Sequence, residues 1–134
     1  MIDNEISNKS MVERFYIDIF KKRELNNSNE FIDDNYINHS SFVGNGRVNF
    51  EEYFNKAYKL FPKGDANIKH VIINNDMVVV HAEHWASNMI FKVRFKAIDV
   101  YRVENGLIVE HWDSLQGMNS LSILFFLCKS FFKL

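Results

Sequence analysis

Hydrophobic positions change their spacing near the middle of the chain, and the change divides the predicted secondary structure in two. Apolar residues between Met11 and Phe20 recur at helical spacing, and so do those of residues 49–61. Residues 30–34 are predicted as a short helix between these two, followed by an extended segment at residues 36–39. After Pro62 the pattern becomes that of strands.

Turn-forming sequences divide this second half into strands. Asn74-Asn75-Asp76 and Glu104-Asn105-Gly106 each predict a hairpin turn, and Ser87-Asn88 marks another. Helices followed by an antiparallel meander are typical of the α+β class. We therefore expect one α+β domain over residues 1–134, with a core at 8–116 and an apolar tail at 117–134. The predicted strands cover residues 68–73, 77–81, 90–103 and 107–115.

Composition narrows the function classes. The net charge is −1, with basic residues spread along the chain, so no nucleic-acid surface is indicated. The single cysteine, Cys128, excludes an internal disulfide and suits a reducing compartment. The acidic, polar N-terminus is not a secretory signal, and no apolar run reaches the roughly 20 residues that span a bilayer. We expect a cytoplasmic protein.

The long strand over residues 90–103 contains an acid on its apolar face. Side chains alternate between the two faces of a strand. Asp99 falls on the face that otherwise carries only apolar and aromatic residues, from Phe91 to Val103. A carboxyl in that position requires a hydrogen bond, an ion pair or a proton. Burial favours the neutral form of a carboxyl, which lets it exchange protons near neutral pH.

Other acidic and imidazole side chains are candidates to join Asp99. In the next strand His111 and Asp113 share one face, while Glu110 and Trp112 share the other; alternation alone does not say which face Asp99 shares. His81 shares a face with Glu83. A metal site would need three such groups to converge, and none of these spacings is diagnostic of zinc or iron. We therefore assign no metal ligands.

The residues around Asp99 also carry a resemblance. The segment from Asp99 to Asp113 resembles the C-terminal hairpin of SnoaL-like proteins, which belong to the nuclear transport factor 2-like superfamily. Tyr36-Ile37-Asn38-His39, with Gly46-Arg47 downstream, and Val79-Val80-His81 add to it. The resemblance covers roughly residues 8–116. It implies a cone-shaped fold in which a curved antiparallel sheet is wrapped by about three N-terminal helices around a pocket.

The resemblance also implies a chemistry. Similar polyketide cyclases use a buried Asp as acid and base for aldol closure, without metal or cofactor, and ketosteroid isomerase uses a comparable Asp as a proton-donating oxyanion partner. Asp99 is the matching position, His111 and Asp113 would face the pocket, and His39 or His81 would relay the proton. A non-catalytic domain that binds a hydrophobic ligand or forms a dimer is the alternative. Residues predicted to contact the small hydrophobic ligand are Phe15, Tyr36, Phe54, Phe95 and Tyr101.

The remaining residues are expected to be structural, apart from the tail. His70 and His84 are expected at the surface or in the framework, and Trp112 is expected to pack on the outer face of the sheet. The apolar run 121–134 departs from the family pattern. It is expected to pack over the open sheet face or into a homodimer interface. Attachment to a membrane surface and closure of the pocket mouth are the alternatives.

Overall fold

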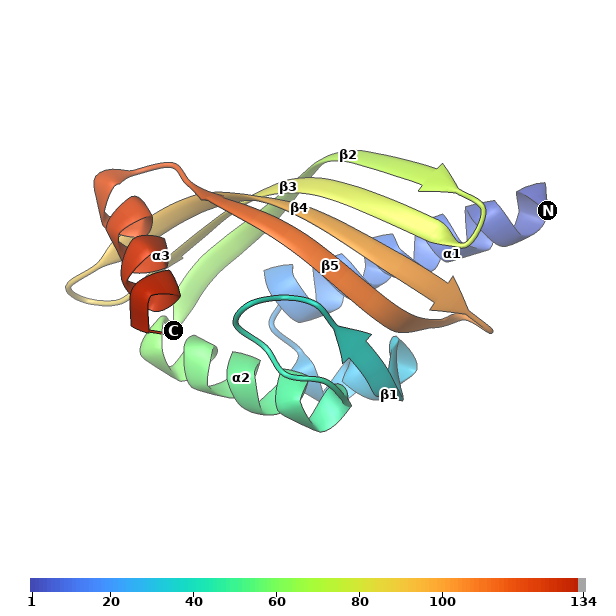
Figure 1. Cartoon of the computed structure of the whole chain (residues 1–134), viewed down its shortest axis with the longest axis horizontal. Coiled ribbons are helices and arrows are strands. Elements are labelled where there is room, and N and C mark those ends of the chain that lie inside the picture. Colours follow the sequence, from blue (N-terminus) through green and yellow to red (C-terminus); the bar gives the residue numbers. More distant parts are fainter. Residues whose placement is uncertain (133–134) are drawn as a thin grey trace.

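The protein consists of one curved sheet with helices on one side, as a computed structural model that describes residues 1–132 shows (Figure 1). The five strands have the order β1-β5-β4-β3-β2. This arrangement confirms the predicted α+β, cone-shaped fold. The strands are β1 (Ile32–Asn38), β2 (Lys63–Asn74), β3 (Met77–Ser87), β4 (Lys92–Glu104) and β5 (Leu107–Gly117), and the α-helices are α1 (Ile2–Phe15), α2 (Arg47–Leu60) and α3 (Ser120–Phe132).

Tight turns build most of the sheet. Strands β2 to β5 form an antiparallel meander, as the turn sequences predict. The hairpins turn at Asn75 and Asn105, whose φ angles of 57° and 51° are in the left-handed region that asparagine tolerates. Strand β1 pairs with β5 in parallel. The sheet is mixed and does not close into a barrel, because β1 and β2 are its two edges.

The N-terminal half differs from the prediction in its short elements. Helix α1 continues directly into a π-helical segment, Tyr16–Lys21, and a 3₁₀ helix covers Leu25–Glu30. The helix predicted over residues 30–34 is wrong, because β1 begins at Ile32. The Ile108 amide donates to the carbonyl oxygen of Phe31 at 2.7 Å, which ties this segment to β5. Pairing with a sheet edge therefore outweighs the local helical pattern.

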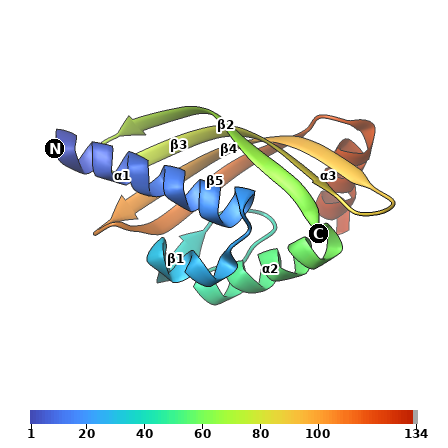
Figure 2. The ribbon, with the colours of Figure 1, turned by 180° about the vertical axis from the view of Figure 1, so that it is seen from behind.

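The core lies between α1 and the sheet, at the end away from α3 (Figure 2). Phe15, at the end of α1, is its centre, with ring centroids 5.3 to 6.1 Å from four other aromatic rings. Small residues of β3, including Val80 and Ala82, are fully buried beneath it. Burial of one large apolar side chain contributes about 1.5–3 kcal/mol to stability. Packing is therefore dense at this end of the cone.

Helix α3 covers the other end. Its first turn is capped by Asn119, whose Oδ1 accepts from the Ser122 amide at 3.0 Å. Phe126 then packs against Phe42 and Phe95, with centroids 6.0 and 5.5 Å apart. The predicted tail is thus a helix, and its last two residues, 133–134, lie outside the described residues. None of the helices within residues 1–132 is both long and apolar enough to cross a membrane.

Candidate functional site

A cavity of about 430 Å³ lies between the inner face of the sheet, α2 and α3. Its inner end is formed by Asp99, Tyr101 and Ile108, which are at most 6% exposed. Its outer end includes Leu60, which is 59% exposed, so the cavity reaches the surface there. The aromatic residues predicted to contact a ligand all line it, namely Phe15, Tyr36, Phe54, Phe95 and Tyr101.

Alternation along β4 places Asp99 as the sequence predicts. The residue is 6% exposed and faces the cavity with the buried side chains of its own strand. In the β4–β5 register Asp99 lies opposite Asp113, and Tyr101 lies opposite His111. Residues opposite each other in an antiparallel pair share a face. His111 and Asp113 therefore join Asp99 on the cavity side, which decides the alternative that alternation left open.

On one side, Asp99 is hydrogen-bonded to a histidine whose orientation is fixed. His111 Nε2 lies 2.8 Å from Asp99 Oδ1, and His111 Nδ1 lies 3.0 Å from Asn38 Oδ1. The Ser40 amide also donates to Asn38 Oδ1, at 2.9 Å, which identifies that atom as the oxygen. His111 Nδ1 must therefore carry a proton. Its Nε2 faces Asp99 either as the N–H of an imidazolium or as the acceptor of a carboxyl proton.

On its other side, Asp99 is joined to a tyrosine and a second histidine. Tyr16 donates its hydroxyl to Asp99 Oδ2 at 3.1 Å, and His84 Nε2 lies 2.5 Å from the same hydroxyl. Burial lowers the pKa of His84 to about 4, so the ring is neutral near pH 7. Burial, with Asp99 beside it, raises the pKa of Tyr16 well above 10, so the phenol keeps its proton. His84 can then donate to Tyr16 while Tyr16 donates to Asp99.

These contacts form a continuous hydrogen-bonded chain at the inner end of the cavity, which we call the Asp99 chain. It runs in the order His84, Tyr16, Asp99, His111 and Asn38. Its members come from the π-helical segment and from strands β1, β3, β4 and β5. A proton gained or lost at Asp99 can be balanced by a shift within the neighbouring hydrogen bonds. The arrangement suits reversible proton transfer.

Two further phenols lie near this chain. Tyr36 and Tyr101 are each 2% exposed and line the cavity, and their hydroxyls have no hydrogen-bond partner among residues 1–132. Burial raises the pKa of both phenols above their usual range, so both remain protonated at neutral pH. An unsatisfied buried hydroxyl costs about 1–3 kcal/mol. A ligand oxygen at the inner end of the cavity would remove that cost.

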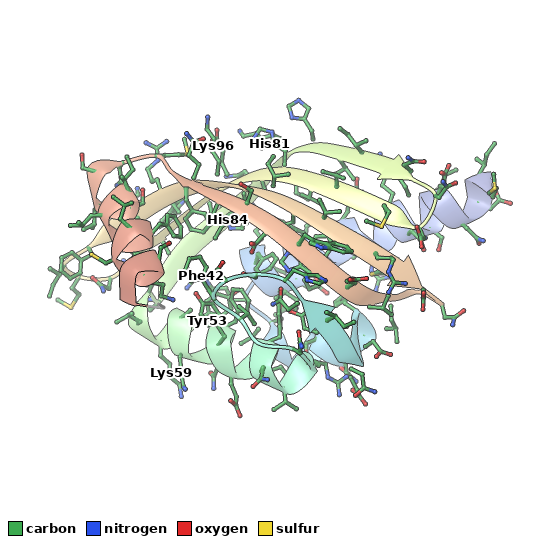
Figure 3. All side chains as sticks on the ribbon, in the orientation of Figure 1. Phe42, Tyr53, Lys59, His81, His84 and Lys96 are labelled. Carbon is green, nitrogen blue, oxygen red and sulfur yellow. The ribbon has the colours of Figure 1, made fainter. Side chains whose placement is uncertain are left out.

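Three histidines lie elsewhere than predicted. His81 is opposite Ile98 on the outer face of the sheet, where its ring stacks on His70, so its predicted place in the pocket is wrong (Figure 3). The prediction of His39 in the pocket is also wrong. Its ring stacks on Trp112, with 4.9 Å between the ring centroids, and is hydrogen-bonded to Glu110 at 2.7 Å, outside the cavity. His84, expected in the framework or at the surface, points instead into the cavity (Figure 3).

The same groups could hold a cation. The ligand atoms of Asp99, His111 and Asp113 lie within 4.8 Å of one another. Two carboxylates and an imidazole suit several divalent ions. In the present arrangement His111 Nε2 is directed at Asp99, so an ion would have to replace that hydrogen bond.

Comparisons with known proteins identify a family and similar solved structures. A family model described as SnoaL-like polyketide cyclase matches residues 10–122. Similar solved structures include a candidate polyketide cyclase from Acidithiobacillus ferrooxidans, with TM-score 0.73 and 14% identity over 92% of this chain and 95% of that chain. AclR, a candidate hydroxylase from Streptomyces galilaeus, has TM-score 0.74 and 16% identity over 93% and 98% of the two chains.

A protein from a soil-derived mobile gene cassette, Bal32a, is also similar. Its TM-score is 0.73, with 18% identity over 83% of this chain and 90% of that chain. At identities this low the likeness shows the fold, and the chemistry has to be argued from the site. No curated protein matches the sequence.

Proposed function

The chain belongs to the SnoaL-like polyketide cyclase family, and from this premise we propose that it catalyses acid–base chemistry on a small hydrophobic carbonyl compound. Asp99 exchanges the proton, either in an aldol cyclisation or in an isomerisation. The observation that carries the proposal is the Asp99 chain, in which the buried carboxyl is hydrogen-bonded to His111 on one side and, on the other, to Tyr16, which contacts the neutral His84.

The first chemical step is proton abstraction next to the carbonyl. Asp99, as carboxylate, takes the proton from the carbon adjacent to the substrate carbonyl. The electron pair of that C–H bond forms a C=C bond to the carbonyl carbon, and the π pair of the C=O bond moves onto the oxygen. Tyr36 and Tyr101 donate their free hydroxyls to this oxygen as its negative charge develops. His111 and Tyr16 hold the two oxygens of Asp99. The enolate then either attacks a second carbonyl or takes the proton back at another carbon.

The cavity supports the substrate class. Apart from the groups around Asp99, its inner wall is largely aromatic and aliphatic, including Phe15, Phe50 and Ile108. A volume of about 430 Å³ suits a compound of two or three fused rings or an equivalent chain. A hydrophobic wall also keeps water from the enolate, which strengthens its hydrogen bonds to the phenols.

Hydrogen–deuterium exchange tests the proposal without knowledge of the natural substrate. The apolar ketone 1-tetralone is incubated with the protein in D₂O, and deuterium at the carbon next to its carbonyl is followed by mass spectrometry. We expect the wild-type protein to accelerate the exchange and Asp99→Asn to lose about 10²–10⁴ of that acceleration. If 1-tetralone binds equally well to both proteins and neither accelerates exchange, the pocket binds without turnover and the proposal fails.

A further inference from the structure

Exposed apolar side chains gather at the end of the molecule where the cavity reaches the surface. Met89 and Ile90, in the turn between β3 and β4, are 103% and 80% exposed, and Leu127 on α3 is 63% exposed. Exposed apolar residues are common singly, but a group of them around a cavity opening indicates an interaction surface. We call this group the mouth rim; it consists of Leu60, Met89, Ile90, Phe91, Ile123, Leu124 and Leu127.

The rim is one surface although its residues come from three segments. Asn88 donates its side-chain amide to the Leu60 carbonyl oxygen at 3.1 Å, which joins the β3–β4 turn to the end of α2. Asn119, just before α3, donates to the Lys92 carbonyl oxygen at 3.1 Å. The end of α2, the β3–β4 turn and α3 lie together at one end of the molecule in both ribbon views (Figures 1 and 2).

Basic residues outnumber acidic ones at this end. Residues 53–64, 84–98 and 114–132 contain no aspartate or glutamate, although the whole chain has 17 acidic and 16 basic residues. Of the acids next to these segments, Asp65 is paired with Lys21 at 2.8 Å and Glu83 lies opposite Lys96. Basic residues in the same three segments are Lys56, Lys59, Lys63, Lys92, Arg94, Lys96 and Lys129. Most of the molecule's basic side chains elsewhere have acidic neighbours, whereas this end presents lysine beside exposed apolar side chains.

We propose that the mouth rim docks on an anionic lipid bilayer. Apolar side chains that enter the acyl boundary and lysines that meet anionic headgroups are the two contributions that hold peripheral proteins on membranes. The rim supplies both: Met89 and Ile90 project from a hairpin tip, and Lys59 and Lys63 flank Leu60. A second protein with an apolar face would not by itself account for the excess of basic residues.

Docking would place the cavity opening against the bilayer. Leu60 belongs to the rim and also lines the cavity, so the two are continuous. A hydrophobic compound dissolved in the bilayer could then enter the cavity without crossing water. This consequence deepens the proposed function, since it names a membrane-dissolved compound as the substrate, but the docking itself does not depend on catalysis.

Vesicle flotation tests the docking directly. The full chain is mixed with vesicles of phosphatidylcholine containing about 30 mol% phosphatidylglycerol, and with vesicles of phosphatidylcholine alone. We expect at least about tenfold more protein on the anionic vesicles, and release at about 1 M NaCl, where the Debye length falls to about 3 Å. The ketone exchange assay is run without vesicles, so failure of docking and failure of catalysis are separate results.

Two pairs of substitutions locate the surface. The variants Met89→Asp/Ile90→Asp and Lys59→Glu/Lys63→Glu should each reduce flotation about tenfold or more, because one removes the insertion and the other the attraction. Ile72→Asp is the matched control: Ile72 is 63% exposed near the far end of β2 and should float like wild type. Far-ultraviolet circular dichroism and thermal melting confirm that each variant is folded.

Three results would overturn the proposal. The first is a wild-type protein that does not float with anionic vesicles. The second is a Met89→Asp/Ile90→Asp variant that floats as well as wild type. The third is sedimentation showing that wild type self-associates without lipid while this variant is monomeric and the vesicles bind neither; the rim would then be an interface between copies of the chain.

Discussion

His111 Nδ1 lies 3.0 Å from Asn38 Oδ1, and this contact fixes which nitrogen of the ring faces Asp99. We expect Asn38→Ala to leave the fold intact and to reduce ketone exchange about tenfold to a hundredfold, because His111 can then rotate or change tautomer. Nitrogen-15 shifts of the His111 ring should show a protonated Nδ1 in wild type and a mixture in the variant. A variant with unchanged shifts and unchanged exchange would contradict this role.

Tyr16→Phe should impair both stability and exchange. The substitution leaves His84 without a partner and removes one of the two hydrogen bonds to Asp99, both in a buried setting. We expect a loss of about 1–3 kcal/mol in the free energy of unfolding, measured by urea titration. Tyr58→Phe is the comparison, since the Tyr58 hydroxyl donates to the Ile19 carbonyl oxygen at 2.6 Å and takes no part in the Asp99 chain. It should lose stability and keep the greater part of the exchange rate.

Alternation was sufficient to predict part of this site. The apolar face of β4 identifies Asp99, whereas only the family resemblance implied that His111 and Asp113 lie on the same side. The turn alone would pair Asp99 with Trp112, because Glu104 lies opposite Leu107 and Val103 opposite Ile108. A register shift between Arg102 and Val103 moves Asp99 opposite Asp113, and this irregularity could not be predicted from the sequence. Trp112, expected on the outer face, lies against His39 there.

The faces of the β3 histidines were harder to predict from sequence. Residues 77–80 are apolar on both faces of the strand, so alternation there does not show which face is buried. The signal lay further on: Ala82 separates His81 from Glu83, which puts His84 with Val80 and Ala82 on the buried face. Tyr16 could also have been found, since it follows Val12 by four positions on the apolar face of the first helix. The position of β1 could not be predicted, because its pairing with β5 depends on chain distant in sequence.

His84 predicts a pH dependence of stability. Its pKa is about 4 in the folded protein against 6.5 as the ordinary value. As pH falls from about 6.5 to 4 the unfolded chain takes up a proton that the folded ring does not, so the free energy of unfolding falls across this window. The loss from this one group is about 3 kcal/mol when complete. Urea titrations at several pH values should show that the free energy of unfolding depends less on pH in His84→Asn than in wild type.

Tyr36→Phe should raise stability and lower turnover. The Tyr36 hydroxyl is buried without a hydrogen-bond partner among the described residues, so its removal should add about 1 kcal/mol to the free energy of unfolding. If the hydroxyl donates to the enolate oxygen, the same variant should lose about 10–10³ of the exchange rate. Thermal melting and the exchange assay measure the two effects. A variant that gains stability and keeps its full rate would remove Tyr36 from the proposed mechanism.

Gly117 lies against the start of α3, so a larger residue at this position should displace the helix from the cavity. A Cβ at Gly117 would lie 2.6 Å from the backbone nitrogen of Ile123, and backbone atoms cannot move aside cheaply. Gly117→Ala should therefore displace the start of α3, at a cost of about 1–3 kcal/mol, and separate Phe126 from the cavity wall. Trypsin should then cut after Lys129 faster than in wild type, as followed by mass spectrometry.

Gly106→Ala is the matched control for this experiment. Gly106 has a φ of +75° and nothing within 4 Å of the added Cβ, so alanine there strains the β4–β5 turn without touching α3. It should lower stability and leave the rate of cutting at Lys129 near that of wild type, provided both are compared well below their melting temperatures. If the two variants are cut equally fast, cutting follows global unfolding, and α3 is not held over the cavity by its contact with Gly117.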